Sequence, residues 1–263
     1  MGDLQKLIQG KIKTMSFAHD STRVFQCYIR YGSDEQRQHA FEELRDDFVQ
    51  LSKAKYSRNI VKKFLMYGSK PQTAEITRSL RGQVRKLLRH AEASAIVEYA
   101  CNDQAVLERR TMLTEELYGN TFPLYKSADH PTLDKVLEVQ PEKLELIMDE
   151  MKQILTPVAQ KEAVIKHSRV HKALLDFFTY APAKLRSEMI EAIREAVIYL
   201  VHTHDGARVA MHCLWHGTPK DRTVIVKTMK TYVEKVANGQ YSRLVLLAPD
   251  SHIGEKQKYQ QRN

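Results

Sequence analysis

The sequence predicts an all-α fold in which about six helical repeats of 36 residues stack into a solenoid. The first observation behind this prediction is a stretch of similar residues that recurs at a constant spacing along the chain. The second is the spacing of apolar residues within each copy, which follows the 3.6-residue period of a helix. No part of the sequence alternates apolar and polar residues as a half-buried strand would. Because a helix pair of this length cannot bury its apolar face alone, neighbouring repeats must stack.

The repeat is clearest between residues 22–32 and 58–68, which align without a gap at an offset of 36 residues. In both copies the apolar residues stand at the third, fourth, seventh and eighth places, on one face of a helix. Later copies keep the spacing, except that one interval is 77 residues and the last is 35. The six copies begin at Thr22, Arg58, Ser94, His171, Ala207 and Ser242.

The turn after the aligned helix has a recurring composition. A glycine stands where a helix end favours a left-handed residue, and the serine or threonine that comes next is predicted to cap the following helix. Residues 37–51 and 73–88 each have the apolar spacing of one continuous amphipathic helix, which we predict as the other helix of the repeat. Two such helices open with a proline. The turn residues are Gly32, Gly68, Gly217, Ser33, Ser69, Thr218, Pro71 and Pro219.

The wide interval between the third and fourth copies predicts a less regular middle region. Residues 105–118 and 142–155 are expected to form amphipathic helices. Between them, residues 119–125 are interpreted as a degenerate repeat in which Pro123 interrupts a helix, and residues 127–141 as a longer connection.

We divide the chain into a solenoid over residues 1–248 and a polar, disordered tail over residues 249–263. Pro249 ends the last helix, and no polar terminal cap of the kind that a solenoid needs follows it. We therefore interpret the sequence as an incomplete repeat array that is truncated at its C-terminus. The residues expected to be poorly packed for this reason are Leu244, Val245 and Leu247.

The net charge of +9 in 263 residues is concentrated in one part of the chain. Residues 50–90 hold eleven Lys or Arg and one acidic residue, whereas residues 91–150 hold thirteen acidic residues and five Lys or Arg. Such a basic block is typical of a surface that meets a polyanion, and the alternative is a solvated basic face. The sequence has no run of 18 apolar residues and no signal-peptide pattern, so we expect neither membrane insertion nor secretion.

Signatures of catalysis and of metal binding are lacking in the sequence. It contains no phosphate-binding glycine loop, no nucleophile elbow and no zinc-protease motif, so we expect no cofactor and no enzymatic activity. Cys27, Cys101 and Cys213 lack the spacing of a disulfide framework or a zinc ribbon, which favours the cytosol or the nucleus. His212 and His216 are spaced as zinc ligands can be, but they fall on ordinary helix positions of the repeat and are interpreted as structural.

The repeat length, together with a polar triad at places one, two and five of the second helix, resembles the Pumilio (PUF) RNA-binding family. Residues 18–26, 204–214 and 238–245 are most similar to its Puf-A branch. The resemblance covers residues 12–248 and implies a right-handed α-α superhelix whose second helices line the nucleic-acid face. It also implies a nuclear, nucleolar protein that acts in ribosome biogenesis and rRNA processing.

In the PUF mode of recognition, places one and five reach a single base edge, and place two stacks between neighbouring bases. The pairs Thr22–Gln26 and Ser94–Glu98 have side chains that could bond a base edge. The second copy has two cations at these places, and long cationic side chains suit phosphates better.

Place two is an arginine in three copies, Arg23, Arg208 and Arg243. One interpretation is that these guanidinium groups contact the nucleic acid. The other is that they bridge to neighbouring acids such as Asp20 or Asp205. An aromatic stripe shares the apolar face of the second helices and is predicted to pack in the core. Its members are Tyr28, Phe64, Phe177 and Phe178.

We therefore predict a non-enzymatic RNA- and DNA-binding protein that contacts the phosphate backbone with little sequence specificity. The expected partners are RNA, in particular a ribosomal precursor, then DNA and pre-ribosomal proteins; no membrane partner is expected, and the chain is predicted to be a monomer. The alternative is a protein-binding helical scaffold of the HEAT or armadillo kind. The predicted nucleic-acid-binding residues are Thr22, Arg23, Gln26, Lys55, Arg58, Asn59, Lys62, Lys63, Arg85, Lys86, Arg89, Ser94, Glu98, Lys172, Arg208 and Arg243.

Overall fold

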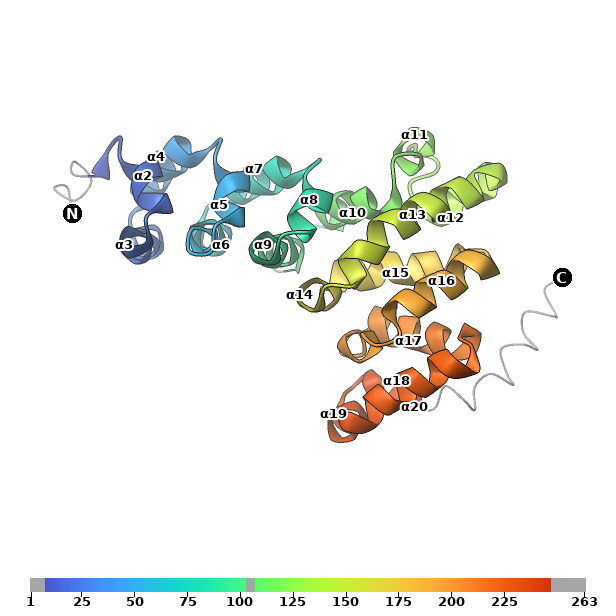
Figure 1. Cartoon of the computed structure of the whole chain (residues 1–263). Helices are drawn as coiled ribbons and strands as arrows, with labels where there is room; N and C mark the ends of the chain where they lie inside the picture. The colour runs from blue at the N-terminus through green and yellow to red at the C-terminus, as the bar shows by residue number, and fades with distance from the viewer. Residues whose placement is uncertain (1–7, 103–106, 247–263) are drawn as a thin grey trace. The chain divides into compact units, whose positions relative to one another are not determined.

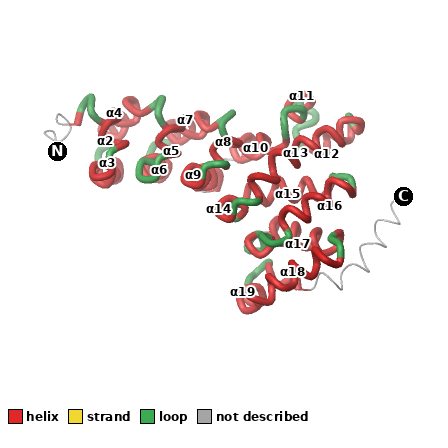
Figure 2. The backbone as a smooth tube through the Cα atoms, in the orientation of Figure 1, coloured by secondary structure: helices red, strands yellow, loops and turns green. Residues whose placement is uncertain are grey.

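The computed structural model describes residues 8–102 and 107–246, and all regular structure in these two ranges is helical. This confirms the predicted all-α fold class. The chain forms two compact units, residues 1–113 and residues 114–263. Short loops join the helices within each unit (Figures 1 and 2). None of the described helices is both long enough and apolar enough to cross a bilayer.

The second and third repeats of the first unit each contain three helices instead of the predicted two, and the described part of the first repeat contains the last two of these, α2 and α3. A long first helix is followed by a short helix and then by the second helix that carries the aligned residues. Figure 1 shows the second helices α3, α6 and α9 along one edge of the unit, and the first helices α4 and α7 along the other. The helices are α2 (Ile12–Phe17), α3 (His19–Tyr31), α4 (Asp34–Leu44), α5 (Phe48–Lys53), α6 (Arg58–Tyr67), α7 (Lys70–Leu80), α8 (Val84–Leu88) and α9 (Ala91–Asn102).

The second unit repeats the same order of first, short and second helix three times. Helix α10 (Leu107–Glu115) spans the boundary between the units. The remaining elements are η1 (Glu116–Tyr118), α11 (Phe122–Tyr125), α12 (Leu133–Val139), η2 (Pro141–Lys143), α13 (Leu144–Ala159), α14 (Glu162–Ile165), α15 (Ser168–Tyr180), α16 (Ala183–Ile193), η3 (Val197–Tyr199), α17 (His204–His216), α18 (Pro219–Thr231), α19 (Val233–Asn238) and α20 (Ser242–Leu246), where η marks a 3₁₀ helix.

Aromatic rings from consecutive helices fill the core of the first unit. Phe41 of α4, Phe48 of α5 and Phe64 of α6 are all buried, and their ring centroids lie 5.1 to 5.7 Å apart. Aromatic rings at this separation attract one another, and this attraction adds to the stabilisation that comes from burying their apolar area. The predicted aromatic stripe is likewise buried in both units, which confirms its assignment to the core.

The prediction of single continuous helices over residues 37–51 and 73–88 was wrong, because each is split by a turn. Gly82 has a positive φ of 76°, which ends α7 before α8 begins. At residues 45–47 the reason is packing. Phe41 and Phe48 would stand about 10 Å apart along the axis of a straight helix, and the turn brings their ring centroids within 5.1 Å.

The three turn glycines are not left-handed as predicted. Gly32, Gly68 and Gly217 have φ values of −68° to −71° and extended ψ values. A Cβ at any of them would lie 2.4 to 2.5 Å from the carbonyl oxygen four residues earlier, so close backbone approach is what favours glycine here. Ala181 stands at the same place of another copy, with a φ of −63° and an extended ψ of 140°.

The predicted caps are confirmed, and in two of them the third residue of the helix also bonds a neighbouring repeat. Ser33, Ser69 and Thr218 all form capping boxes with the third residue of the helix. In α7 that residue is Gln72, whose Oε1 accepts from the Ser69 backbone while its Nε2 donates to Gln38 of α4 at 2.7 Å.

In α18 the third residue is Asp221, which accepts from the backbone and hydroxyl of Thr218 and from Arg194 of α16 at 2.8 Å. Burial alone would raise the pKa of Asp221, but the hydrogen bonds from Thr218 and Arg194 outweigh it and lower that pKa. The charged cap therefore also joins two repeats.

The middle region differs from its prediction in two respects. Pro123 lies in the first turn of α11, where its missing N–H costs nothing, instead of interrupting a helix. The predicted connection over residues 127–141 contains α12 and the start of η2. Near the end of the described residues, Leu244 is 43% exposed, but Val245 is only 1% exposed, which corrects the expectation of poor packing there. Leu247 and the predicted tail, residues 249–263, lie outside the described residues.

We expect the substitution Thr218→Ala to lower the free energy of unfolding by about 1 kcal/mol, because it removes an N-cap oxygen. Thr223→Ala is the matched control in the same helix, since Thr223 is exposed and alanine favours a helix interior. Urea unfolding followed by circular dichroism measures both variants. Equal stability of the two variants would contradict a capping role for Thr218.

Candidate nucleic-acid interface

The residues at place two of the second helices project into solvent. Arg23 and Arg208, the fifth residues of α3 and α17, are exposed, as is Arg243, the second residue of α20. Asp20 and Asp205 pair with the adjacent histidines, and within the described residues none of the three arginines forms an ion pair. The structure therefore does not support the interpretation that these arginines bridge to Asp20 or Asp205, and the interpretation that they contact nucleic acid stays a prediction.

The other residues at place two are more constrained. Asn59 of α6 is half-buried. Lys172 of α15 donates from Nζ to Asp176 at 2.6 Å. Tyr118 donates its hydroxyl to the other oxygen of the same carboxylate at 2.5 Å, and burial followed by the charge of Asp176 raises the pKa of Tyr118. Lys172 is thus held by a local cluster and is less available than the arginines.

A second row of basic residues stands five residues before place one, at the turn that leads into each second helix. Three of its members lie at the ends of the short helices α5, α8 and α14, where a cation favours the helix C-terminus, and the histidine lies three residues after η3. The N-termini of the second helices, which attract anions, lie next to this row. This basic turn row was not predicted as a site, although its 36-residue spacing is visible in the sequence. The row consists of Lys53, Arg89, Lys166 and His202.

Cations and tyrosines alternate over the second helices of the first unit. The Lys62 ammonium lies 5.0 Å from the centroid of the Tyr99 ring, joining α6 to α9. The Arg30 guanidinium lies 5.0 Å from the ring of Tyr31 and 5.8 Å from that of Tyr67. Tyr31 is 64% exposed, so its ring presents a flat apolar surface beside a positive charge.

The same pairing recurs within α6 and in the turn that precedes it. The Lys63 ammonium lies 5.5 Å from the ring of Tyr67, and the Lys55 ammonium lies 5.6 Å from the ring of Tyr56. These tyrosines were not among the predicted contacts. The signal that could have found Tyr67 is its 36-residue spacing from Tyr31, whereas Tyr56 and Tyr99 have no tyrosine at that spacing.

The side chains at place one are buried, which corrects the prediction that Thr22 and Ser94 are available to a base edge. Each is only 1% exposed, and its hydroxyl donates at 2.8 Å to a carbonyl oxygen three residues earlier, that of His19 or Ala91. The partners at place five, Gln26 and Glu98, are half-buried. The other copies with a short or apolar side chain at place one bury it as well, at Ala207 and Ser242.

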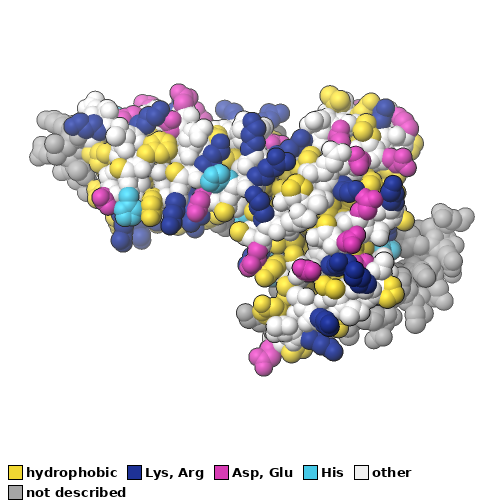
Figure 3. Space-filling model, viewed as in Figure 1, with side chains coloured by type: hydrophobic (Ala, Val, Ile, Leu, Met, Phe, Trp, Pro, Cys, Tyr) yellow, Lys and Arg dark blue, Asp and Glu magenta, His cyan; other side chains and the backbone are white. Residues whose placement is uncertain are grey.

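Arg58 of α6 forms a 2.5 Å ion pair with Glu92 of α9, so one of the two cations predicted to face phosphates also joins neighbouring helices. The other, Lys62, is exposed. Lys86 and Arg89 are exposed at α8, next to the half-buried Arg85. Figure 3 shows Lys and Arg side chains gathered on the surface around this short helix. The basic block of the sequence is therefore divided between the second helices and the short helices.

Known proteins of similar sequence and structure place this arrangement in a family. No protein-family model matches the sequence. Pumilio homolog 3 of Homo sapiens is 87% identical over 248 residues, which cover 94% of this chain and 38% of that protein. Pumilio domain-containing protein 12 of Caenorhabditis elegans is 32% identical over 246 residues, which cover 94% of this chain and 32% of that protein.

Among solved structures, a crystal structure of human Puf-A matches with a TM-score of 0.92 and 87% sequence identity, covering 94% of this chain and 48% of that one. A crystal structure of human Puf-A in complex with DNA matches with a TM-score of 0.91 at the same identity, covering 94% of this chain and 49% of that one. The chain belongs to the Pumilio repeat family, in its Puf-A branch.

Membership of the Pumilio family confirms both the resemblance seen in the sequence and the expectation of a non-enzymatic protein. The chain spans about two fifths of the length of the Pumilio homolog 3 proteins that it matches.

At place one of the fourth copy, this Pumilio chain buries a histidine between two repeats. His171 is fully buried, its Nε2 lies 2.6 Å from the carbonyl oxygen of Ile165, and its Nδ1 lies 2.6 Å from the hydroxyl oxygen of Thr203. That hydroxyl also caps α17 by accepting from the Gly206 backbone at 3.0 Å. A Cβ at Gly206 would lie 2.9 Å from the His171 ring, so glycine keeps this network closed. His171 therefore joins repeats and does not read bases.

His212 is part of the packing of the same Pumilio repeats. Its ring stacks on those of Phe178 and His216. Burial lowers the pKa of His212 to about 4, and the neighbouring positive charges of His216, Arg186 and Arg208 act in the same direction. In the part of the chain that the structure describes, no group of three or more side chains is placed to hold a metal ion. His212 is a neutral packing residue at neutral pH.

We expect His212 to make folding pH-dependent below neutrality. Its folded pKa of about 4 lies below the unfolded value of 6.5, so the unfolded state binds more protons between these values. Stability therefore falls as the pH drops from about 6.5 towards about 4, by at most about 3 kcal/mol from this group. Urea unfolding of His212→Gln should show a flatter pH dependence than the parent chain.

His90→Gln, at an exposed histidine, is the control for this experiment and should keep the parent pH dependence. If His212→Gln also keeps the parent slope, His212 does not carry the effect.

Proposed function

We propose that the chain binds single-stranded nucleic acid, RNA above all, through its phosphate backbone and with little sequence preference. The observation that carries this proposal is the recurrence in register of exposed place-two arginines, Arg23, Arg208 and Arg243, near the N-termini of second helices. Helix N-termini and guanidinium groups both attract phosphates. Arg208 and Arg243, 35 residues apart, give the second unit two contacts of this kind, and Arg23 gives the first unit one.

The buried place-one side chains support weak sequence preference. A bidentate contact to a base edge contributes about 1–3 kcal/mol of discrimination. The hydroxyls of Thr22 and Ser94 already donate to carbonyl oxygens of their own helices. In each of these copies the place-one side chain is therefore not available to bond a base edge together with the side chain at place five. Phosphate contacts, in contrast, discriminate little between sequences.

The alternating cations and tyrosines favour a single strand over a duplex. Unpaired bases can stack on exposed rings such as Tyr31 and Tyr56, whereas paired bases are already stacked on one another. The basic side chains beside these rings, including Arg30 and Lys55, would neutralise the adjoining phosphates.

We extend the proposal to the setting that the Puf-A resemblance implies. The chain would act on ribosomal precursor RNA in the nucleolus, in contact with pre-ribosomal proteins and as a monomer. DNA is included because a human Puf-A structure, 87% identical to this chain, is a complex with DNA. The predicted site residues that remain exposed or half-buried are proposed to contact the strand, except the ion-paired Arg58 and Lys172 and the acidic Glu98. They are Arg23, Gln26, Lys55, Asn59, Lys62, Lys63, Arg85, Lys86, Arg89, Arg208 and Arg243.

Charge reversal at place two tests the proposal. We expect Arg23→Glu with Arg208→Glu to weaken binding of several unrelated RNA strands to a similar extent. The slope of log affinity against log salt should become shallower by about 0.7 for each phosphate that the variant no longer neutralises. Fluorescence anisotropy between about 50 and 200 mM salt measures both quantities.

Arg78→Glu, on the first-helix row at α7, makes the same charge change as Arg23→Glu alone and should weaken binding less than that single variant. Equal weakening by Arg78→Glu and by the place-two variants would contradict the assigned face. Binding of one sequence far above the others, with a shallow salt slope, would contradict the backbone mode. Absence of binding to any strand would favour the protein-binding scaffold.

A further inference from the structure

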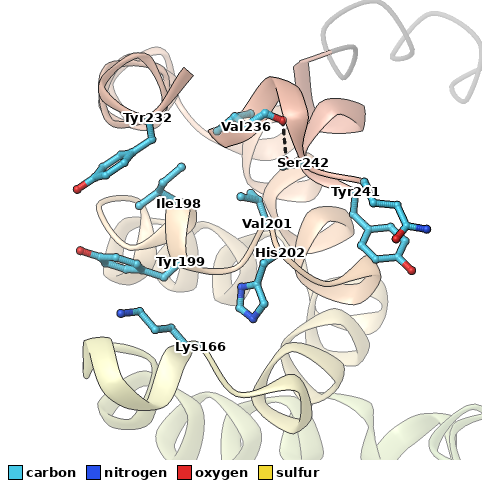
Figure 4. Close-up of a pocket in the computed structure, with 11 residues that line it drawn as sticks. Lys166, Ile198, Tyr199, Val201, His202, Tyr232, Val236, Tyr241 and Ser242 are labelled. Atoms are coloured by element: carbon cyan, nitrogen blue, oxygen red, sulfur yellow. Dashed lines mark hydrogen bonds between the residues drawn. The ribbon is translucent and has the colours of Figure 1, made fainter. Parts of the chain in front are cut away.

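The second unit has a pocket of about 590 Å³ at the turns that lead into two of its second helices. Figure 4 shows Tyr199 and Tyr232 on one side of it and Tyr241 on the opposite side, with Val201 and Val236 between them. The volume lies within the range of about 300–1,000 Å³ that is typical of ligand pockets. No residue named above as a base reader lines it.

The lining combines aromatic rings with a few polar groups. Besides the three tyrosines, the ring of His202 and the ammonium of Lys166 face the pocket (Figure 4). Gln240 and Gly239 add amide groups at the rim. The Ser242 hydroxyl is already committed to the Val236 carbonyl oxygen at 2.7 Å. Flat apolar walls with polar groups at the edge suit a planar heteroaromatic ring better than a branched aliphatic side chain.

The pocket adjoins the proposed path of the nucleic acid. Lys166 and His202 are the two members of the basic turn row in this unit, each five residues before place one. On the other side of the pocket, Tyr241 directly precedes Ser242 and the exposed Arg243 at place two. A strand that follows the N-terminal ends of α17 and α20 would pass the mouth of the pocket.

Lys166 is available to a phosphate at that mouth. Its ammonium lies 4.7 Å from the Tyr199 ring centroid and 2.8 Å from Glu162, four residues earlier. Both partners of this ion pair are substantially exposed, and exposed pairs of this kind are weak. A phosphate can therefore share the ammonium with Glu162 while the ring of Tyr199 stays in place.

We propose that this pocket takes one unpaired nucleobase of a bound single strand, with the adjoining phosphate at Lys166. The inference rests on the proposed function, because the strand must first be bound along the second helices. The base inserts among Tyr199, Tyr232 and Tyr241, and its polar edge meets the amides of the rim. Any of the four bases offers a ring face, so the pocket adds affinity for unpaired bases without adding a sequence code.

The test uses the full chain and two probes of equal length, an oligouridine strand and the same ribose-phosphate strand without bases. Tyr232 is 38% exposed, so Tyr232→Ala should leave the fold intact, which a thermal melt verifies. We expect this variant to bind oligouridine at least about fivefold more weakly, with an unchanged salt slope. Tyr232→Phe should bind as the parent does, because it keeps the ring. Affinity for the strand without bases should be the same for all three proteins.

Tyr125→Ala removes a tyrosine elsewhere in the same unit and serves as the matched control. Photocrosslinking of 5-iodouridine strands, followed by mass spectrometry, should mark Tyr199, Tyr232 or Tyr241. Unchanged oligouridine binding by Tyr232→Ala, or equal weakening on the strand without bases, would overturn the inference while leaving the proposed function intact; the pocket would then suit an apolar side chain of a protein partner. Failure of the parent chain to bind any strand would instead overturn the proposed function.

Discussion

Burial of each second helix against its neighbours is the constraint on which the rest of the structure depends. A single repeat has too little apolar surface to be stable alone, so Phe64 and its equivalents must pack between adjoining helices. This packing fixes the rotation of every second helix about its own axis. Places four, seven and eight then face inward in the described copies, whereas place three is exposed in the first and last copies, at Val24 and Leu244. Place two faces outward and is exposed at Arg23, Arg208 and Arg243. The outward direction of Arg23 in the first unit and of Arg208 in the second follows from core packing, before any ligand is considered.

The same rotation explains why places one and two behave so differently although they are adjacent in sequence. A rotation of about 100° per residue separates them. Place one falls at the edge of the core, where Thr22 bonds its own helix and His171 bonds a neighbouring repeat. Place two falls outside the core, exposed at Arg23 and half-buried at Asn59. Such a surface favours phosphate contacts by long cationic side chains. The place-one side chains that could bond a base edge are already hydrogen-bonded within the protein.

Much of this organisation could be predicted from the sequence because it repeats. The stripe around Tyr28 and the caps at Ser69 and Thr218 depend on local spacing and chemistry, and both were found where expected. Features that depend on contacts between distant residues could not be predicted. The split of the first helix follows from Phe48 packing on Phe41, the burial of Ser94 from its helix neighbours, and the pairing of Lys62 with Tyr99 from the approach of α6 to α9.

The double use of the cap residues has a consequence for how the chain reaches its fold. Gln72 closes the box that starts α7 with one end of its amide and holds Gln38 of the preceding repeat with the other, and Asp221 divides its two oxygens in the same way. A helix that started one residue early or late would forfeit both interactions together. The packing of a repeat on its neighbour therefore favours the correct first residue of its first helix. A helix with a shifted start would lose both the cap and the bond to the neighbouring repeat, because one side chain makes both.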